Sequence, residues 1–129
     1  MGHLLLVDDS DVLRAIMLRS LRQADLEVGG FLEARNGAEA VAQVCREPRP
    51  CLILCDVSMP GSDAAALVRA LRSRTDAPIV MLASESKSAE AHAAVAAGAN
   101  DWVRKPFTSE SIRAALLPFL PVGALEERR

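Results

Sequence analysis

Four charged side chains follow short apolar runs in the sequence, and their chemistry suggests a site for a cation and a phosphate. Asp8 and Asp9 follow one run, Asp56 follows another, and Lys105 follows a third. Three neighbouring acids repel one another and raise one another's pKa unless a cation offsets them. Oxygen-only ligands favour a hard ion, and Mg²⁺ is typically bound by one or two carboxylates, waters and a phosphate. The four residues therefore predict a Mg²⁺-dependent phosphoryl site.

Short apolar runs alternate with amphipathic stretches five times, which predicts an α/β fold. Near-continuous apolar runs are typical of strands buried in a parallel sheet, and the intervening stretches predict helices on both faces of that sheet. The predicted strands are His3–Val7, Val28–Ala34, Cys51–Cys55, Pro78–Ala83 and Asp101–Arg104. Ligands of such folds lie at the carboxyl ends of the strands, so the residues that follow the apolar runs are expected to converge.

The first helix is predicted to start at a cap formed by Ser10 or Asp11. Its predicted buried stripe consists of Val12, Leu13, Ile16, Met17 and Leu21, with Arg14 mostly off the stripe.

The other helices are marked by turn residues and by apolar faces. Asn36-Gly37 precedes a helix with Ala40, Val41, Val44 and Cys45 on one face, and a third helix is built on Ala64, Leu67, Val68 and Leu71. Residues 86–97 are alanine-rich and helical, and Gly98 is expected to end that helix. Thr108 is expected to open the last helix.

Length and composition set the frame. The chain has 129 residues, which suits one domain over residues 1–120, followed by a polar tail or the start of a linker over 121–129. A net charge of −2 without a basic run argues against nucleic-acid binding through this domain. No apolar run approaches the ~18 residues of a membrane span, and the acidic turn at Asp8 argues against a signal peptide.

The odd number of cysteines predicts buried free thiols in a reducing cytoplasm, at Cys45, Cys51 and Cys55.

Three motifs give the chain a family resemblance. They are Leu5-Leu6-Val7-Asp8-Asp9, Leu54-Cys55-Asp56-Val57-Ser58-Met59-Pro60, and the segment from Gly98 to Phe107 that contains Lys105-Pro106. Over residues 3–120 the chain resembles a receiver domain of the two-component response regulators, of the chemotaxis-regulator kind. The resemblance implies a flavodoxin-like sheet of order 2-1-3-4-5.

The resemblance also implies roles for the charged residues. Asp56 would accept a phosphoryl group from a phosphohistidine on a sensor histidine kinase or a phosphotransfer protein. Asp9, Asp56 and the backbone carbonyl of Ser58 would hold Mg²⁺ directly, and Asp8 would act through a bound water. Lys105 would pair with the acids at rest and with a phosphoryl oxygen afterwards, and its peptide bond to the following proline is expected to be cis, aiming the lysine into the pocket.

The sequence departs from the family at the switch. Receivers carry a serine or threonine where this chain has Ala83, with Ser84 one residue later. Trp102 matches the position of the switch aromatic. Successive strand residues point to opposite faces, so Ser84 would replace the hydroxyl only after a local backbone change. The alternatives are that Ser84 serves through a shifted loop, that coupling to Trp102 is weak, or that switching takes another route.

Three classes of function remain open. The first is a phosphorylation-controlled signalling domain, which would catalyse only its own phosphorylation and dephosphorylation. It would present the face formed by the helix over 86–97, the strand over 101–104 and the last helix to a downstream partner or a second copy, with Asp101, Arg104 and Arg113 on or near that face. The second is a degenerate receiver acting as a constitutive interaction module, which Ala83 favours. The third, a Mg²⁺-dependent phosphatase, needs an acid where Ser58 stands.

Overall fold

The computed structural model describes residues 2–61 and 63–120, and its centre is one parallel sheet. The five strands lie in the order β2-β1-β3-β4-β5, as predicted. Their bounds are His3–Val7 for β1, Gly30–Ala34 for β2, Pro50–Asp56 for β3, Ile79–Ala83 for β4 and Asp101–Arg104 for β5. The predicted tail over residues 121–129 lies outside the described residues.

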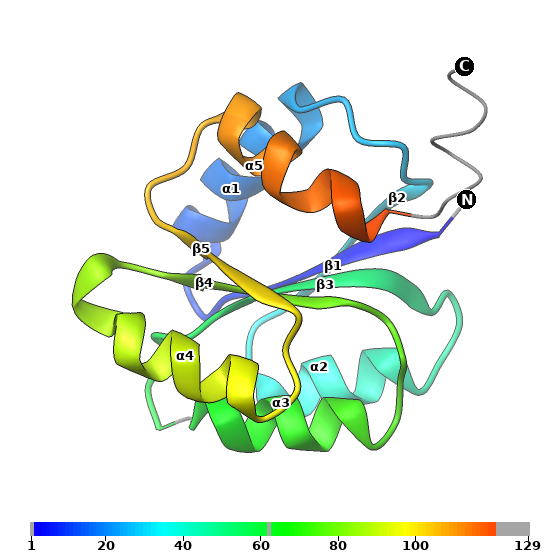
Figure 1. Cartoon of the computed structure of the whole chain (residues 1–129). Helices are drawn as coiled ribbons and strands as arrows, with labels where there is room; N and C mark the ends of the chain where they lie inside the picture. The colour runs from blue at the N-terminus through cyan, green and yellow to red at the C-terminus, as the bar shows by residue number, and fades with distance from the viewer. Residues whose placement is uncertain (1, 62, 121–129) are drawn as a thin grey trace.

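Helices cover both faces of the sheet. Figure 1 shows α1 and α5 on one face and α2, α3 and α4 on the other. Their bounds are Asp11–Gln23 for α1, Gly37–Val44 for α2, Ala64–Arg72 for α3, Ser88–Ala96 for α4 and Ser109–Leu116 for α5, with short 3₁₀ turns at Glu85–Lys87 and Leu117–Phe119. Within the described ranges, none of these helices is long and apolar enough to cross a membrane.

The apolar runs form the core because both of their faces are buried. Leu5 and Val7 of β1 pack on the side of α2, α3 and α4, whereas Leu4 and Leu6 pack on the side of α1 and α5. All four side chains are fully buried. The doubly covered parallel sheet therefore explains why β1 and β3 read as continuous apolar segments.

Side-chain caps begin four of the helices soon after a strand or loop. The cap side chains are those of Ser10, Asn36, Asp63 and Thr108, and each accepts a hydrogen bond from a backbone N–H of the helix that follows. Such caps satisfy donors that have no partner inside the helix. Of the two caps predicted for α1, Ser10 is the one used. The strand-to-helix turns are thereby fixed at the carboxyl edge of the sheet.

The predicted stripe of α1 is wrong in most of its members. Val12, Leu13 and Ile16 are exposed by 70%, 48% and 57%. The buried residues of α1 are Arg14, Met17, Leu18 and Leu21, at helical positions i, i+3, i+4 and i+7. The helix is therefore rotated relative to the prediction, and it buries an arginine while exposing three large apolar side chains.

Smaller differences concern element ends and one thiol. The second strand begins at Gly30 rather than at Val28, and Cys45 is the exposed C-terminal cap of α2 rather than a buried thiol. Cys51 is half-buried and Cys55 is fully buried, where burial raises the pKa of its thiol to about 12. The prediction of buried thiols therefore holds for Cys55 and fails for Cys45.

Gly98 ends the segment of α4 with a positive φ of 132°, which side chains other than that of glycine rarely adopt. A Cβ at this position would also lie 2.9 Å from Cγ of Arg72. We expect Gly98→Ala to lower the free energy of unfolding by about 1–3 kcal/mol. Gly61→Ala is the matched control, because Gly61 also has a positive φ, 68°, but a Cβ there meets nothing within 4 Å. Urea unfolding of both variants checks this, and an equal loss in the two would contradict a contribution from Arg72.

Candidate functional site

The carboxyl ends of the strands bring the predicted residues to one edge of the sheet. Asp8 and Asp9 follow β1, Asp56 ends its neighbour β3, and Lys105 follows β5. The backbone N–H of Lys105 donates to the carbonyl of Ala83 at the end of β4, at 2.9 Å, so the β5 loop is tied to that edge. The prediction that these residues converge at one edge agrees with the topology.

Asp56 is buried and held at both carboxylate oxygens. It is only 3% exposed. Lys105 Nζ donates to Asp56 Oδ2 at 2.7 Å, and the backbone N–H of Ser58 donates to Asp56 Oδ1 at 2.9 Å. The Lys105–Pro106 peptide bond is cis, as expected from the resemblance. These two donors fix the orientation of the Asp56 carboxylate, as attack by one of its oxygens requires.

Asp8 is a second buried carboxylate, and its charge is not compensated. Its Oδ1 accepts a hydrogen bond from the backbone N–H of Ser10 at 2.8 Å. Its Oδ2 is buried and has no hydrogen-bond partner within the described residues. Burial and, after it, the neighbouring Asp56 carboxylate raise the pKa of Asp8 to about 6, while the hydrogen bond from Ser10 and the charge of Lys105 oppose the change. Near neutral pH a negative charge is therefore present that lacks a partner.

The donor chemistry of this edge fits Mg²⁺. The two buried carboxylates of Asp8 and Asp56, the first with its unpaired Oδ2, supply hard oxygen ligands, and a divalent cation would compensate the charge that burial penalises. Asp9 is exposed at the mouth of this edge. Across residues 2–61 and 63–120, no three histidine, cysteine or acidic side chains are grouped closely enough to hold a metal ion by themselves.

A cavity of about 380 Å³ lies beside the acids. Its polar lining comes from Asp8, Ser84, Lys105 and Ser20, and its apolar lining includes Leu13, Ile16, Met17 and Phe107. The cavity is open to solvent where α1 exposes its apolar side chains. A group that enters the cavity therefore meets a carboxylate and an ammonium as well as apolar surface.

Ala83 and Ser84 differ in their surroundings. Ala83 is fully buried in the core on the side of α2, α3 and α4. Ser84 instead lines the cavity beside Asp8 and Lys105, and its Oγ shares a hydrogen bond of 3.1 Å with Oγ of Ser86. Trp102 is half-buried against the same core as Ala83. Ser86 belongs to the 3₁₀ turn that leads into α4, so the hydrogen bond of the Ser84 hydroxyl runs toward that turn.

The face formed by α4, β5 and α5 contains two notable contacts. The ring of His92 meets that of Trp102 edge to face, with centroids 5.5 Å apart. Arg104 lies 3.9 Å from Glu85 in an exposed ion pair. Arg113 does not serve this face as predicted: its guanidinium donates to the carbonyls of Ala24 and Asp25, both at 2.7 Å. It ties α5 to the end of α1 instead.

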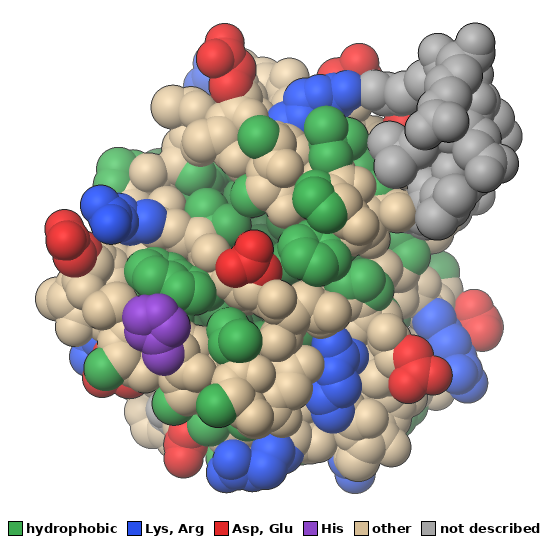
Figure 2. All heavy atoms as spheres, viewed as in Figure 1, with side chains coloured by type: hydrophobic (Ala, Val, Ile, Leu, Met, Phe, Trp, Pro, Cys, Tyr) green, Lys and Arg blue, Asp and Glu red, His purple; other side chains and the backbone are tan. Residues whose placement is uncertain are grey.

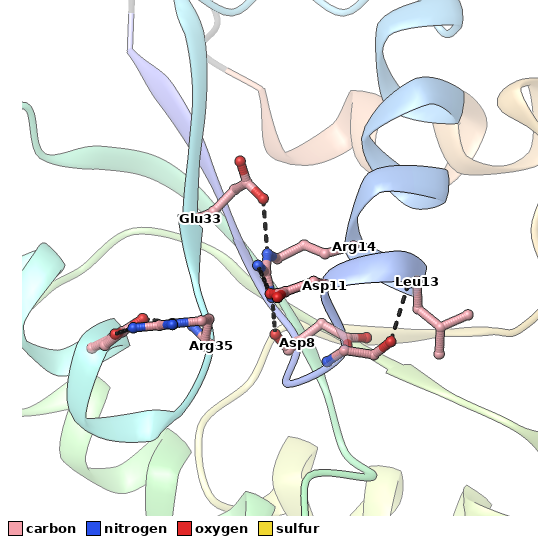
Figure 3. A network of polar contacts seen from close by, with 8 residues as sticks. Asp8, Asp11, Leu13, Arg14, Glu33 and Arg35 are labelled. Atoms are coloured by element: carbon pink, nitrogen blue, oxygen red, sulfur yellow. Dashed lines mark hydrogen bonds and ion pairs between the residues drawn. The ribbon is translucent and has the colours of Figure 1, made fainter.

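Arg14 is a residue that the sequence analysis missed. It is 7% exposed, and its guanidinium donates to the carbonyl oxygen of Asp8, to Asp11 and to Glu33 (Figure 3). Its spacing from Met17, Leu18 and Leu21 was the available signal, because the four share one helical face. An arginine on the buried face of a helix requires partners, and here they include the loop that carries Asp8.

Comparisons with known proteins agree with one another. The response regulator receiver domain family matches residues 4–117. The transcriptional regulatory protein CseB of Streptomyces coelicolor is 33% identical over 94% of the chain, and the chain spans about half of that protein's length, 52%. The chemotaxis protein CheY homolog of Campylobacter jejuni is 32% identical, with 95% of each chain covered.

A solved structure extends the comparison. The receiver domain of a sensor histidine kinase from Pseudomonas aeruginosa PAO1, with a magnesium ion coordinated in the active-site cleft, superposes with a TM-score of 0.77. It is 25% identical, and the alignment covers 92% of this chain and 96% of that one.

Because Asp8 is buried, we predict that removing its charge raises the free energy of unfolding by an amount that depends on pH. The folded pKa of Asp8, about 6, lies above the ordinary value of 3.8, so the folded state holds the proton more tightly and stability falls as pH rises between the two values. Without Mg²⁺, we expect Asp8→Asn to be more stable than the wild type by up to about 3 kcal/mol at pH 8, and to lose this advantage near pH 3.5. Urea unfolding at both pH values measures it. A constant difference would show that the charge of Asp8 is not the cause.

Proposed function

Because the chain belongs to the receiver domain family of two-component response regulators, which are signalling modules, we propose that it is a phosphoacceptor whose Asp56 takes a phosphoryl group from a phosphohistidine. One observation carries the proposal. The buried Asp56 carboxylate pairs with Lys105 at 2.7 Å, next to the uncompensated carboxylate of Asp8. That arrangement combines an oriented oxygen nucleophile with an excess of negative charge that a bound cation would neutralise.

The transfer step assigns a part to each side chain. An oxygen of Asp56 attacks phosphorus, the bond from phosphorus to the donor imidazole nitrogen breaks, and its electron pair stays on that nitrogen. Asp56 then carries an acyl phosphate. Lys105 moves from Asp56 to a phosphoryl oxygen, while the backbone N–H of Ser58 keeps the carboxyl group oriented. Phosphoryl transfer depends mainly on positioning and charge neutralisation, which these groups provide.

The metal ligands are assigned by the resemblance and by the fit of the site. Asp9, Asp56 and the backbone carbonyl of Ser58 would hold Mg²⁺, with Asp8 acting through a bound water, and the ion would neutralise the acids and the incoming phosphoryl oxygens. The exposed position of Asp9 lets it turn toward a cation at the mouth of the site, and the unpaired Asp8 Oδ2 offers an acceptor for a bound water.

The phosphodonor is proposed to be a sensor histidine kinase or a phosphotransfer protein that docks on the exposed apolar residues of α1. Val12, Leu13 and Ile16 are exposed, and Leu13 and Ile16 line the cavity that ends at Asp8 and Lys105. A protein that delivers a phosphoryl group to this site must cover the cavity, so its own apolar side chains would meet this surface.

The output surface is proposed to be the face formed by α4, β5 and α5. Figure 2 shows hydrophobic side chains gathered on this face, with acidic and basic side chains scattered singly among them. Such a mixture suits a protein partner or a second copy of the chain, and it does not suit nucleic acid, which needs concentrated positive charge. A cytoplasmic location is part of the proposal, since free thiols persist in reducing compartments.

The switch is proposed to be weakly coupled to the aromatic residue. Ala83 offers no hydroxyl in the core that contacts Trp102, and the hydroxyl of Ser84 shares its hydrogen bond with Ser86. Phosphorylation would then proceed while the α4–β5–α5 face changes little. The degenerate receiver, a constitutive interaction module, is the second candidate, and the absence of the hydroxyl at Ala83 favours it.

The acceptor is tested by intact mass. With Mg²⁺ and a small acyl-phosphate donor, we expect the wild type to gain the mass of one phosphoryl group and Asp56→Asn to gain none, because the amide removes the nucleophilic oxygen. Asp101→Asn serves as the matched control, since Asp101 is an exposed acid on β5. A gain in Asp56→Asn equal to that of the wild type would rule out Asp56 as the acceptor. The absence of any gain in the wild type would favour the degenerate receiver.

The coupling is tested by fluorescence, because Trp102 is the only tryptophan and the chain has no tyrosine. On phosphorylation we expect little change in Trp102 emission in the wild type and a clear change in Ala83→Ser, where a hydroxyl is restored on the side of Trp102. Ser84→Ala is the control and is expected to leave the emission change as in the wild type. A strong change in the wild type that is lost in Ser84→Ala would instead show that Ser84 performs the switch.

A further inference from the structure

The buried guanidinium of Arg14 holds the loop that carries Asp8 and Asp9, which we call the acid pair. Arg14 Nε donates to Glu33 Oε1 of β2 at 2.8 Å, and one terminal nitrogen donates to the backbone carbonyl of Asp8 at 2.7 Å. The other terminal nitrogen donates to Asp11 Oδ1 at 2.5 Å. Figure 3 shows Arg14 between β2 and the turn from β1 into α1. One side chain thus connects the start of α1, the acidic turn and the second strand.

Arg14 contacts the backbone of the acid pair and does not neutralise its carboxylates. Its partner at Asp8 is the neutral carbonyl, whereas the Asp8 carboxylate accepts from the N–H of Ser10. The charge of Arg14 is met by Asp11 and Glu33. A guanidinium that is mostly buried requires such partners, because a lost one leaves a charged donor without compensation. The turn at Asp8 and Asp9 is therefore held on two sides, by Arg14 and by the cap at Ser10.

We propose that Arg14 is a positioning residue for cation binding: by anchoring the Asp8 carbonyl to β2, it sets the affinity of the acid pair for Mg²⁺. The inference rests on the proposed function, since it assigns a role toward the same site. Ligands that are held by outer partners bind metals more tightly, and loss of such a partner commonly costs 10–100-fold in affinity. The orientation of the turn matters because few protein ligands hold Mg²⁺ and each must be well placed.

The chain provides a matched control in Arg72. Its guanidinium also bridges elements by donating to the carbonyls of Gly98 and Ala77, at 2.8 and 2.6 Å, and to Asn100 Oδ1 at 2.5 Å. These partners precede β4 and β5, so Arg72 serves the amino edge of the sheet, opposite the acids. Both arginines bridge elements through several acceptors, with two carboxylates among those of Arg14 and neutral groups for Arg72, and they anchor opposite edges of the sheet.

The experiment compares Arg14→Lys with Arg72→Lys, both of which keep the charge. Mg²⁺ affinity is measured by calorimetry at fixed pH and ionic strength, and stability by urea unfolding. We expect both variants to lose stability, and only Arg14→Lys to bind Mg²⁺ about 10–100-fold more weakly than the wild type. Unchanged affinity in Arg14→Lys beside a normal wild type would overturn the positioning role alone. A wild type that binds no Mg²⁺ would overturn this role and the metal assignment, while phosphoryl gain at Asp56 is read separately by mass.

A second pair of variants covers the case in which Arg14→Lys does not unfold cooperatively. Glu33→Gln frees one end of Arg14, and Glu39→Gln removes the same charge from the exposed pair that Glu39 forms with Arg35. We expect the Mg²⁺ affinity to fall more in Glu33→Gln than in Glu39→Gln. An equal fall in the Mg²⁺ affinity of the two variants would show that the effect comes from net charge alone, and it would overturn the proposal.

Discussion

Two buried carboxylates at one edge of the sheet, of which only Asp56 contacts the ammonium group of Lys105, are the constraint on which the site depends. Burying a carboxylate without a partner is unfavourable, and near neutral pH Asp8 bears that cost while Asp56 is paired with Lys105. The apolar side chains buried on both faces of the sheet stabilise the fold and offset this cost. The same excess negative charge would attract a divalent cation. The charge that destabilises the buried site is therefore also the charge that would bind the ion.

The surrounding structure fixes these carboxylates by backbone contacts. Ser10 and Ser58 each donate a backbone N–H to the acid two residues before them, and the β5 loop is tied to β4 through Lys105 and Ala83. Rigid contacts at strand ends keep charged groups in place without solvent reorganisation, which is what phosphoryl transfer demands of a protein. Ala83 is not part of the side-chain contacts that hold Asp8 and Asp56, and in the proposal above its lack of a hydroxyl affects only the connection toward Trp102.

The sequence was sufficient to predict the features that depend on strand ends and on strongly amphipathic helices. The stripe of α3 is buried as predicted at Leu67, Val68 and Leu71, and the sheet order and strand β5 also agree. The stripe of α1 failed because apolar side chains there face a cavity and solvent, a tertiary outcome that periodicity does not reveal. Consecutive acids also differ: Asp8 is buried and Asp9 is exposed, since neighbouring residues after a strand point in different directions.

The central claim is that the two carboxylates and Lys105 form a phosphoryl site that requires a divalent cation. The most direct measurement is ¹⁹F NMR of the wild type with beryllofluoride, a mimic of the phosphoryl group, as Mg²⁺ is added. The account predicts bound fluoride signals that appear only with Mg²⁺, because the mimic adds negative charge to an edge that already has an excess. Bound signals of full intensity without Mg²⁺, or none at saturating Mg²⁺, would contradict it.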